Sequence, residues 1–316
     1  MQAKGVRPTV SDSILEWDAA GKRIIIRDLV TQEEFRETEN IQREAWGFQD
    51  LDVVPAAHII AAKWAGGLAL GAFDAGRMIG FVYGFPAMES GHLSMHSHML
   101  AVRKESRRLQ AGLQLKLAQR IRALEMGISE ISWTFDPLQT LNASLNFTRL
   151  GVISNRYLVN FYGEETSSPL HRGVGTDRLW VRWLIDSDMV KARLKPIQGA
   201  EPSNHGGLPD RDTGRIALAL SGEPGPALLC HQGNDWSAPW KPAESLEQAR
   251  ESARIAIEIP SNIEHFKLEN IDMAQAWRAS VQERFLAAFG AGFTAVDFTR
   301  VPTEEGDRSL YLLTKL

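Results

Sequence analysis

Two histidines in an apolar stretch are the residues of this chain best placed to move a proton. His96 and His98 alternate with Ser97 and Met99, a spacing that favours a β-strand with both imidazoles on one face. An imidazole has an ordinary pKa near 6.5, which suits a base working near neutral pH. We predict that His98 or His96 takes a proton from an ammonium group; the alternative is a pair of buried, structural histidines. A metal site is less favoured, because no third ligand has a suitable spacing.

A basic turn follows the same strand and leads into a helix. The turn carries four cationic residues before a leucine-rich segment: Arg103, Lys104, Arg107 and Arg108. The first amides of a helix have no intrahelical partner and carry partial positive charge, so they bind phosphate groups. Gly112 would let an anion approach the backbone closely. The sequence therefore predicts a phosphate site on the amides of Gln110, Ala111, Gly112 and Leu113.

These features resemble the GNAT superfamily of acyltransferases. The segment from Arg107 to Gly112 is similar to motif A, Arg/Gln-x-x-Gly-x-Gly/Ala, with Gln110 where the family usually has its first glycine. The segment from Asn142 to Val152 is similar to the family's Asn-x-x-Ala-x-x-x-Tyr-x-Lys-Leu-Gly-Phe. The series His-x-His-x-Leu-Ala-Val also resembles a strand of arylalkylamine N-acetyltransferases, in which paired histidines serve as the base.

The resemblance implies direct attack of a neutral amine on the thioester carbonyl of an acyl-CoA, with a backbone amide near Leu100 polarising that carbonyl. Phe147 stands where the family often has the tyrosine acid, so Tyr157, Tyr162 or water would replace it. Asp136 is a competing base, and its other interpretation is a turn cap before Pro137. The residues implied to bind acyl-CoA are Leu100, Ala101, Val102, Arg103, Arg107, Arg108, Gln110, Ala111, Gly112, Leu113, Asn142 and Phe147.

Composition narrows the class of protein. The chain has 316 residues, of which 44% are hydrophobic, and a formal net charge of -4. That charge argues against a nucleic-acid partner. We find no apolar run of about 20 residues, the length needed to cross a bilayer, so no membrane association is expected. A single cysteine, Cys230, has neither a disulfide partner nor metal-ligand spacing, which favours a cytoplasmic protein without a bound metal.

Residues 23–186 are expected to form an acyltransferase domain of the α/β class, with a mixed central sheet and helices on both faces. Residues before it are expected to be a polar lead-in. Four helices are expected. The first starts at the Thr31 capping box, the second follows Pro55, the third runs from the phosphate turn to Gly127, and the fourth covers Asn142 to Leu150. The expected strands are Arg23–Arg27, Gly67–Phe73, Met78–Gly84, the histidine strand, Ile128–Phe135, Asn155–Tyr162 and Arg178–Ile185.

Residues 187–210 are predicted to be a linker, and residues 211–316 a smaller C-terminal α/β domain. Its expected helix, Met273–Phe289, presents Trp277 and Phe285 on one apolar face, and we expect this face to dock against the acyltransferase domain or a second subunit. The alternative is a self-sufficient small domain. The order helix, glycine, strand at Gly127 and again at Gly292 also suggests a degenerate duplication. The other expected strands are Arg215–Leu220, Ala227–Cys230, Ala253–Ile259, Thr294–Thr299 and Leu310–Leu313.

The sequence thus predicts an acyl-CoA-dependent N-acyltransferase that moves an acetyl or succinyl-type group to a small amine or amino acid. The C-terminal extension would complete either the substrate pocket or a homodimer. The alternative is a GNAT-like protein that binds CoA or regulates without turnover, because Phe147 has no proton to give and Gln110 replaces a glycine.

Overall fold

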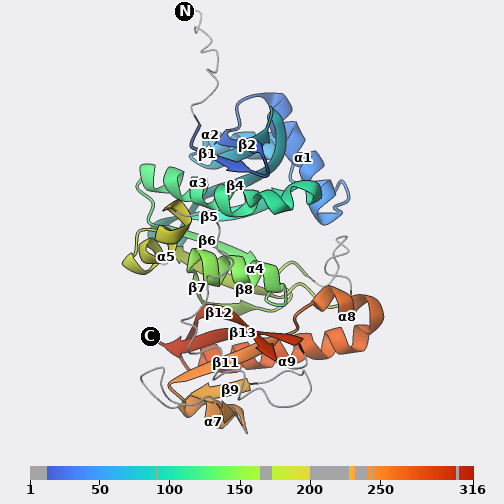
Figure 1. The fold of residues 1–316 in the computed structure, drawn as a ribbon, viewed down its shortest axis with the longest axis vertical. Helices are drawn as coiled ribbons and strands as arrows, with labels where there is room; N and C mark the ends of the chain where they lie inside the picture. Colours follow the sequence, from blue (N-terminus) through green and yellow to red (C-terminus); the bar gives the residue numbers. More distant parts are fainter. Residues whose placement is uncertain are drawn as a thin grey trace, which may run out of the picture. The chain divides into compact units, whose positions relative to one another are not determined.

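The computed structural model describes residues 13–89, 91–163, 173–199, 228–231, 241–243, 245–303 and 306–316 (Figure 1). These form two compact units, one reaching Ser132 and the other beginning at Trp133. The expected order of elements, from the first long strand through two helices, three strands, a helix, a strand, a helix and two strands, is confirmed. No helix among the described residues is long and apolar enough to span a membrane.

The sheet of the first unit has the order β1-β2-β3-β4-β5-β6. Neighbouring strands are antiparallel up to β5, and β5 and β6 are parallel. The strands are β1 (Leu15–Ala19), β2 (Lys22–Asp28), β3 (Leu68–Asp74), β4 (Arg77–Glu89), β5 (His92–Val102) and β6 (Glu130–Phe135), which continues into the second unit.

Strand β1 corrects the expectation of a polar lead-in. Its charged residues alternate with Leu15 and Trp17, and this period of two fits an edge strand with one face on the protein. The indole of Trp17 donates a hydrogen bond to the carbonyl of Leu109 at 3.0 Å. The sequence did not indicate this strand, because its apolar alternation is short and charged residues surround it.

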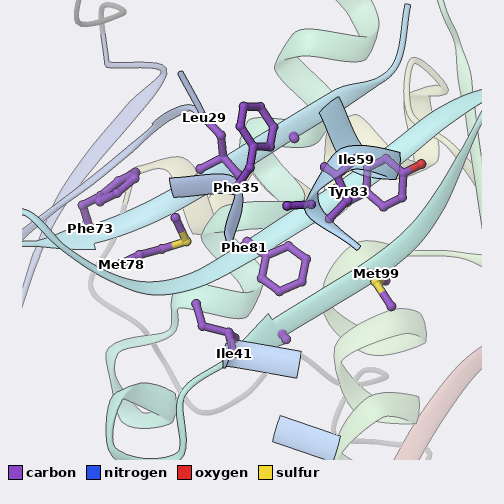
Figure 2. Close-up of a cluster of buried hydrophobic side chains, with 12 residues drawn as sticks. Leu29, Phe35, Ile41, Ile59, Phe73, Met78, Phe81, Tyr83 and Met99 are labelled. Carbon is purple, nitrogen blue, oxygen red and sulfur yellow. The ribbon is translucent and has the colours of Figure 1, made fainter. Parts of the chain in front are cut away.

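Helices cover the sheet of the first unit. They are α1 (Gln32–Trp46), α2 (Ala56–Trp64) and α3 (Ala111–Glu125), and a 3-10 segment, η1 (Lys104–Leu109), precedes α3. The capping box of Thr31 and Glu34 is confirmed, and α2 begins directly after Pro55, which is its N-cap. Side chains of α1 and α2 pack with β3, β4 and β5 around a buried core that includes Phe35, Ile59, Phe81 and Tyr83 (Figure 2).

The sheet of the second unit has the order β8-β7-β12-β13-β11-β9-β10. Its strands are β7 (Ile153–Leu158), β8 (Arg178–Leu184), β9 (Leu228–His231), β10 (Lys241–Pro242), β11 (Arg254–Ile259), β12 (Phe293–Thr303) and β13 (Gly306–Lys315). Its helical segments are α4 (Thr140–Ala143), the π-helical η2 (Ser144–Leu150), α5 (Asp188–Gly199), α7 (Leu246–Glu251), α8 (Ile263–Glu269) and α9 (Ile271–Gly290).

Several expectations for the C-terminal half change. Helix α5 occupies the first part of the expected linker, and β10, α7 and α8 were not predicted. The expected strand Arg215–Leu220 and the remainder of the linker lie outside the described residues. The domain limits 23–186 and 211–316 stay a prediction.

The aromatic face of the C-terminal helix α9 contacts a strand that precedes the expected C-terminal domain in the sequence. Within the second unit, Phe285 of α9 stacks on Tyr157 of β7 with 5.7 Å between ring centroids. Ser154 of β7 also pairs with Ala295 of β12. The aromatic face of α9 is therefore covered by a strand that belongs to the expected acyltransferase fold.

Candidate active site

The two histidines lie side by side on β5, as predicted. Their ring centroids are 6.1 Å apart, and both rings contact Phe85 of β4. The pairing of β4 with β5 shifts by one residue here, from Tyr83 with Met99 to Gly84 with Ser97, so His98 is the extra residue of a β-bulge. Such bulges are common next to active sites, where they redirect a side chain.

One edge of β5 changes its pairing next to these histidines. The parallel pairing of β5 with β6 consists of Met95 with Ile131 and His96 with Ser132, whereas its antiparallel pairing with β4 continues to Val102. The Nδ1 atom of His96 lies 3.3 Å from the hydroxyl of Ser132. From Ser97 onward β5 thus departs from β6 and keeps its partner β4.

Two residues that the sequence did not single out complete the aromatic surroundings of His98. Tyr83 lies edge-on to His98 on one side and to His58 of α2 on the other, with ring centroids 6.0 and 6.1 Å apart. The register of the β4–β5 hairpin could have indicated Tyr83, because it pairs with the residue after His98. Nothing in the sequence indicated His58, which α2 brings there from a distance.

Burial controls protonation in this cluster. It lowers the pKa of His96 to about 4, and the nearby charges of His98 and Lys116 act in the same direction. Burial also lowers the pKa of His98, together with His58. Both imidazoles are therefore neutral at pH 7 and can accept a proton. Tyr83 is fully buried, and burial raises its pKa to about 12, so its hydroxyl stays protonated.

The described residues contain no group of three or more His, Cys, Asp and Glu side chains that could hold a metal ion. On the other face of β5, Nζ of Lys116 donates to the Ser97 hydroxyl at 2.7 Å, and that hydroxyl donates to Gln119 at 2.9 Å. These hydrogen bonds connect α3 to β5 on the face opposite the histidines.

The predicted phosphate turn is built as a sharp corner. Segment η1 ends at Leu109. Its C-cap is Gln110, whose φ of 60° and ψ of 16° lie in the left-handed region, and α3 begins at the next residue. A non-glycine residue there costs about 1–2 kcal/mol. Arg107 and Arg108 are exposed in the last turn before the helix.

Gly112 lies in the first turn of α3, where a side chain would meet only ordinary contacts. A Cβ atom there would lie 3.6 Å from Leu100 and 3.9 Å from Val102. Neither packing nor a positive φ therefore requires glycine at this position. A glycine that the fold does not need is consistent with a ligand that approaches the backbone.

Arg103 and Ala101, also predicted to bind CoA, face the core. The Arg103 guanidinium is buried, pairs with Glu37 and Glu44 of α1, and donates to the carbonyl of Met78 at 3.0 Å. Its amide donates to the carbonyl of Ile79 at 2.9 Å. Of the predicted CoA-binding residues from Leu100 to Arg103, only the half-buried Leu100 and Val102 lie beside the start of α3.

The remaining predicted residues lie in the second unit. Asn142 is exposed on α4, whereas Phe147 is fully buried with its ring 5.4 Å from that of Tyr311. The hydroxyl of Tyr157 donates to Asp177 at 2.7 Å, and burial raises its pKa above the ordinary range. A phenol held in this way is a poor donor to a departing thiolate. Tyr162 is exposed, with its hydroxyl 3.3 Å from that of Thr134 on β6.

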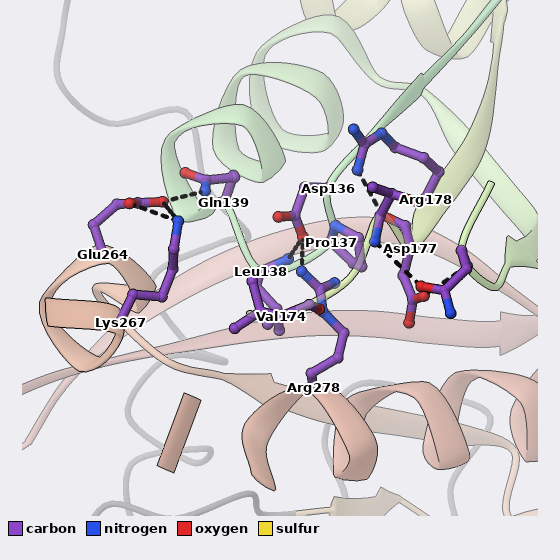
Figure 3. Close-up of polar contacts among 12 residues, drawn as sticks. Asp136, Pro137, Leu138, Gln139, Val174, Asp177, Arg178, Glu264, Lys267 and Arg278 are labelled. Atoms are coloured by element: carbon purple, nitrogen blue, oxygen red, sulfur yellow. Dashed lines mark hydrogen bonds and ion pairs between the residues drawn. The ribbon is translucent and has the colours of Figure 1, made fainter. Parts of the chain in front are cut away.

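Asp136 has the turn-capping role that was weighed against catalysis (Figure 3). Its carboxylate accepts a hydrogen bond from the amide of Leu138 at 3.0 Å and forms an ion pair with Arg278 of α9 at 2.9 Å. Burial alone would raise its pKa, but the positive charge of Arg278 and the bond from Leu138 outweigh it, so its pKa is lowered. Asp136 thus stays ionised and binds the C-terminal helix.

No protein-family model matches the sequence, and no curated protein sequence matches it. Many solved structures resemble part of the chain. A GNAT family acetyltransferase from Elizabethkingia anophelis with acetyl-CoA bound is 15% identical, with a TM-score of 0.41 over 51% of this chain and 97% of that one. The aminoglycoside 6'-N-acetyltransferase from Enterococcus faecium is 16% identical, with a TM-score of 0.40 over 52% of this chain and 98% of that one.

An IAA acetyltransferase from Bacillus cereus is 15% identical, with a TM-score of 0.39, and the match covers 50% of this chain and 97% of that one. Each of these matches thus spans nearly the whole of the other protein and about half of this chain.

Proposed function

We propose that this protein is an acyl-CoA-dependent N-acyltransferase that acts on the amino group of a small amine or amino acid. One observation carries the proposal: β5 holds the neutral histidines at its bulge and ends at a basic turn and a helix start with a free glycine. A base and an anion site on one strand are what transfer from a phosphate-bearing thioester to an amine needs.

In this reaction the phosphates of acyl-CoA would bind the first amides of α3, with Arg107 or Arg108 beside them. His98 would take a proton from the acceptor ammonium, directly or through water, so that the neutral nitrogen attacks the thioester carbonyl. An amide of β5 near Leu100 would stabilise the oxyanion, which collapses to the amide and releases CoA as thiolate. His98 is favoured over His96, because a base with a pKa near 4 has little tendency to hold the proton.

The acid that protonates the departing thiolate is not Phe147, and the engaged hydroxyl of Tyr157 does not favour that role. We propose water or the exposed Tyr162 instead. We propose an acetyl or a succinyl-type group as the group transferred, and a homodimer as the oligomeric state. A second candidate, a protein that binds CoA without turnover, is favoured by the lack of a hydroxyl at Phe147.

Free-thiol release with acetyl-CoA and succinyl-CoA, measured against a panel of amino acids and amines, tests the proposal. Acceptor-dependent thiol release is expected from the enzyme. CoA binding by calorimetry without thiol release from any acceptor would support the non-catalytic candidate. Arg107→Glu should weaken CoA binding by about 1–3 kcal/mol if the charge lies in a partly desolvated site. Unchanged affinity in this variant would contradict the phosphate placement.

A further inference from the structure

Two segments of the chain share one topology. The first is β6, the helical segment α4–η2, β7 and β8; the second is β11, the helices α8–α9, β12 and β13. In both, the last strand lies between the other two, as β6-β8-β7 and as β12-β13-β11. The two orders are mirror sequences that meet where β7 pairs with β12.

Local details of the two segments agree as well. In each segment a glycine with positive φ, 73° at Gly151 and 84° at Gly292, lies between the helix and the strand that follows it in the sequence, β7 or β12. In the first segment the register with β8 shifts between Ile153 and Arg156, the second and fifth residues after the glycine. In the second segment the register with β13 shifts between Ala295 and Asp297, the third and fifth residues. The irregularity therefore occurs at the same place.

The contact between the segments has the symmetry of a twofold axis. Ser154 and Ala295, which pair with each other, are both the third residue after the glycine. A residue that meets its own equivalent lies on the axis of an isologous interface. The flanking contacts are reciprocal: η2 packs on β12, and α9 packs on β7.

One contact in each direction shows which residues are involved. Thr148 of η2 donates to the carbonyl of Phe298 at 2.6 Å, and Phe285 of α9 stacks on Tyr157. Tyr157 and Phe298 are both the sixth residue after the glycine, so equivalent positions receive the opposite helix.

We infer that the C-terminal segment, residues 254–315, is a second copy of the strand-helix-strand-strand module of residues 130–184, and that it binds the β7 edge as a built-in partner across a pseudo-twofold axis. This replaces the alignment of Gly127 with Gly292 that the sequence suggested, because Gly292 corresponds to Gly151. An interface of this symmetry is the kind that joins two identical subunits.

The two copies differ in what precedes them. The first follows β5, the basic turn and α3, whereas the chain directly before β11 is the short α7, which lacks the run of arginine and lysine residues found before α3. The second copy therefore supplies a surface and no phosphate turn. It covers the β7 edge, which would otherwise expose unpaired backbone groups to another chain.

Spin labels on the full-length chain test the axis directly. A twofold axis exchanges Val159 with Arg300 and Arg149 with Gly290, so the distance from 159 to 290 must equal that from 149 to 300. Two double-cysteine variants, V159C with G290C and R149C with R300C, carry the labels in a Cys230→Ser background. Overlapping distance distributions are expected from pulsed electron resonance. Clearly different distances would overturn the inference.

The covered edge has its own test in the full chain. Ser154→Cys with Ala295→Cys should form an internal disulfide, because directly opposed residues of antiparallel strands lie within reach. Ser154→Cys alone should stay free of intermolecular disulfides. Cross-linked dimers of the single variant would show that the β7 edge is open and that the second copy is not its partner. If the buried double variant fails to fold, the label pairs, none of which includes a buried residue, still decide.

Discussion

The roles of individual residues in the candidate site follow from their burial. His96, His98 and Tyr83 are close together, yet each has a different relation to protons. The pKa of His96 is lowered to about 4, that of His98 is lowered by burial and His58, and that of Tyr83 is raised to about 12. One cluster thus contains a weak base, a candidate base and a hydroxyl that keeps its proton.

Replacing the candidate base should separate chemistry from binding. His98→Ala should lower turnover by about 10²–10⁴-fold at neutral pH with CoA affinity nearly unchanged. Much of the loss should recover at high pH, where the free amine is abundant. His92→Ala, an exposed histidine on the same strand, is the matched control and should keep full turnover. Equal rates for His98→Ala and the unmodified protein would exclude this base.

His96 should make folding sensitive to acid. Its pKa is about 4 in the folded protein and near 6.5 in the unfolded chain, so the unfolded chain binds the proton more readily. Above pH 6.5 the imidazole is neutral in both states, so its burial does not oppose folding. As the pH falls from 6.5 to 4, the unfolded chain binds the proton first, and the free energy of unfolding decreases by roughly 2–3 kcal/mol. Urea unfolding of the wild type and His96→Gln across this range measures the difference. Parallel curves would contradict the prediction.

Two buried tyrosines should respond oppositely to loss of the hydroxyl. The hydroxyl of Tyr83 has no hydrogen-bond partner among the described residues, whereas that of Tyr311 donates to the carbonyl of Pro137 at 2.8 Å. Tyr83→Phe should raise the free energy of unfolding by about 1 kcal/mol, and Tyr311→Phe should lower it by a similar amount. Denaturant titration of both variants gives the two signs, and a destabilised Tyr83→Phe would reveal an additional partner.

At the scale of elements, the corner between η1 and α3 combines strain with an accessible helix start. Gln110 bends the chain at a positive φ that disfavours a side chain, and Gly112 leaves the first helical turn uncovered. Backbone strain of this kind is concentrated at functional sites, where the surrounding structure maintains it.

Gln110→Gly should relieve that strain. The expected gain is about 1 kcal/mol in the free energy of unfolding, because glycine adopts the left-handed region without steric penalty. Gln110→Ala is the control and should bring no such gain, since it keeps the Cβ atom. Thermal and urea unfolding measure both. A stability of Gln110→Gly no greater than that of Gln110→Ala would mean that the side chain of Gln110 contributes contacts of its own.

At the scale of the molecule, the C-terminal half completes the second unit instead of forming a separate module. Phe285 is fully buried between Tyr157 of β7 and Tyr311 of β13, and Arg278 pairs with Asp136 at the end of β6. The strands of the expected acyltransferase fold and the C-terminal elements therefore share one core.

A core shared in this way should be sensitive to the loss of one ring. Phe285→Ala should cost about 3–5 kcal/mol, whereas Leu286→Ala, its half-exposed neighbour on the same helix, should cost far less. Urea unfolding followed by tryptophan fluorescence, to which Trp180 and Trp183 of β8 contribute, reports whether the unit loses stability. Similar costs for the two variants would indicate separate cores.

The sequence alone determined the strand of His96 and His98, the capped helix at Thr31, the helix start after the basic turn and the apolar face of α9. Each of these depends on local spacing, a period of two or of 3.6 residues, which a single segment already contains. The α/β class followed from the order of such segments.

Tertiary structure alone decided what depends on residues distant in the chain. The meeting of His58, Tyr83 and His98, the burial of Arg103 against α1 and the ion pair of Asp136 with Arg278 join separate elements. The pairing of Ser154 with Ala295, which defines the pseudo-twofold axis, depends on the register of two strands far apart in sequence. Local spacing determines which face of a segment is apolar, and only packing determines what covers that face and how far burial shifts a pKa.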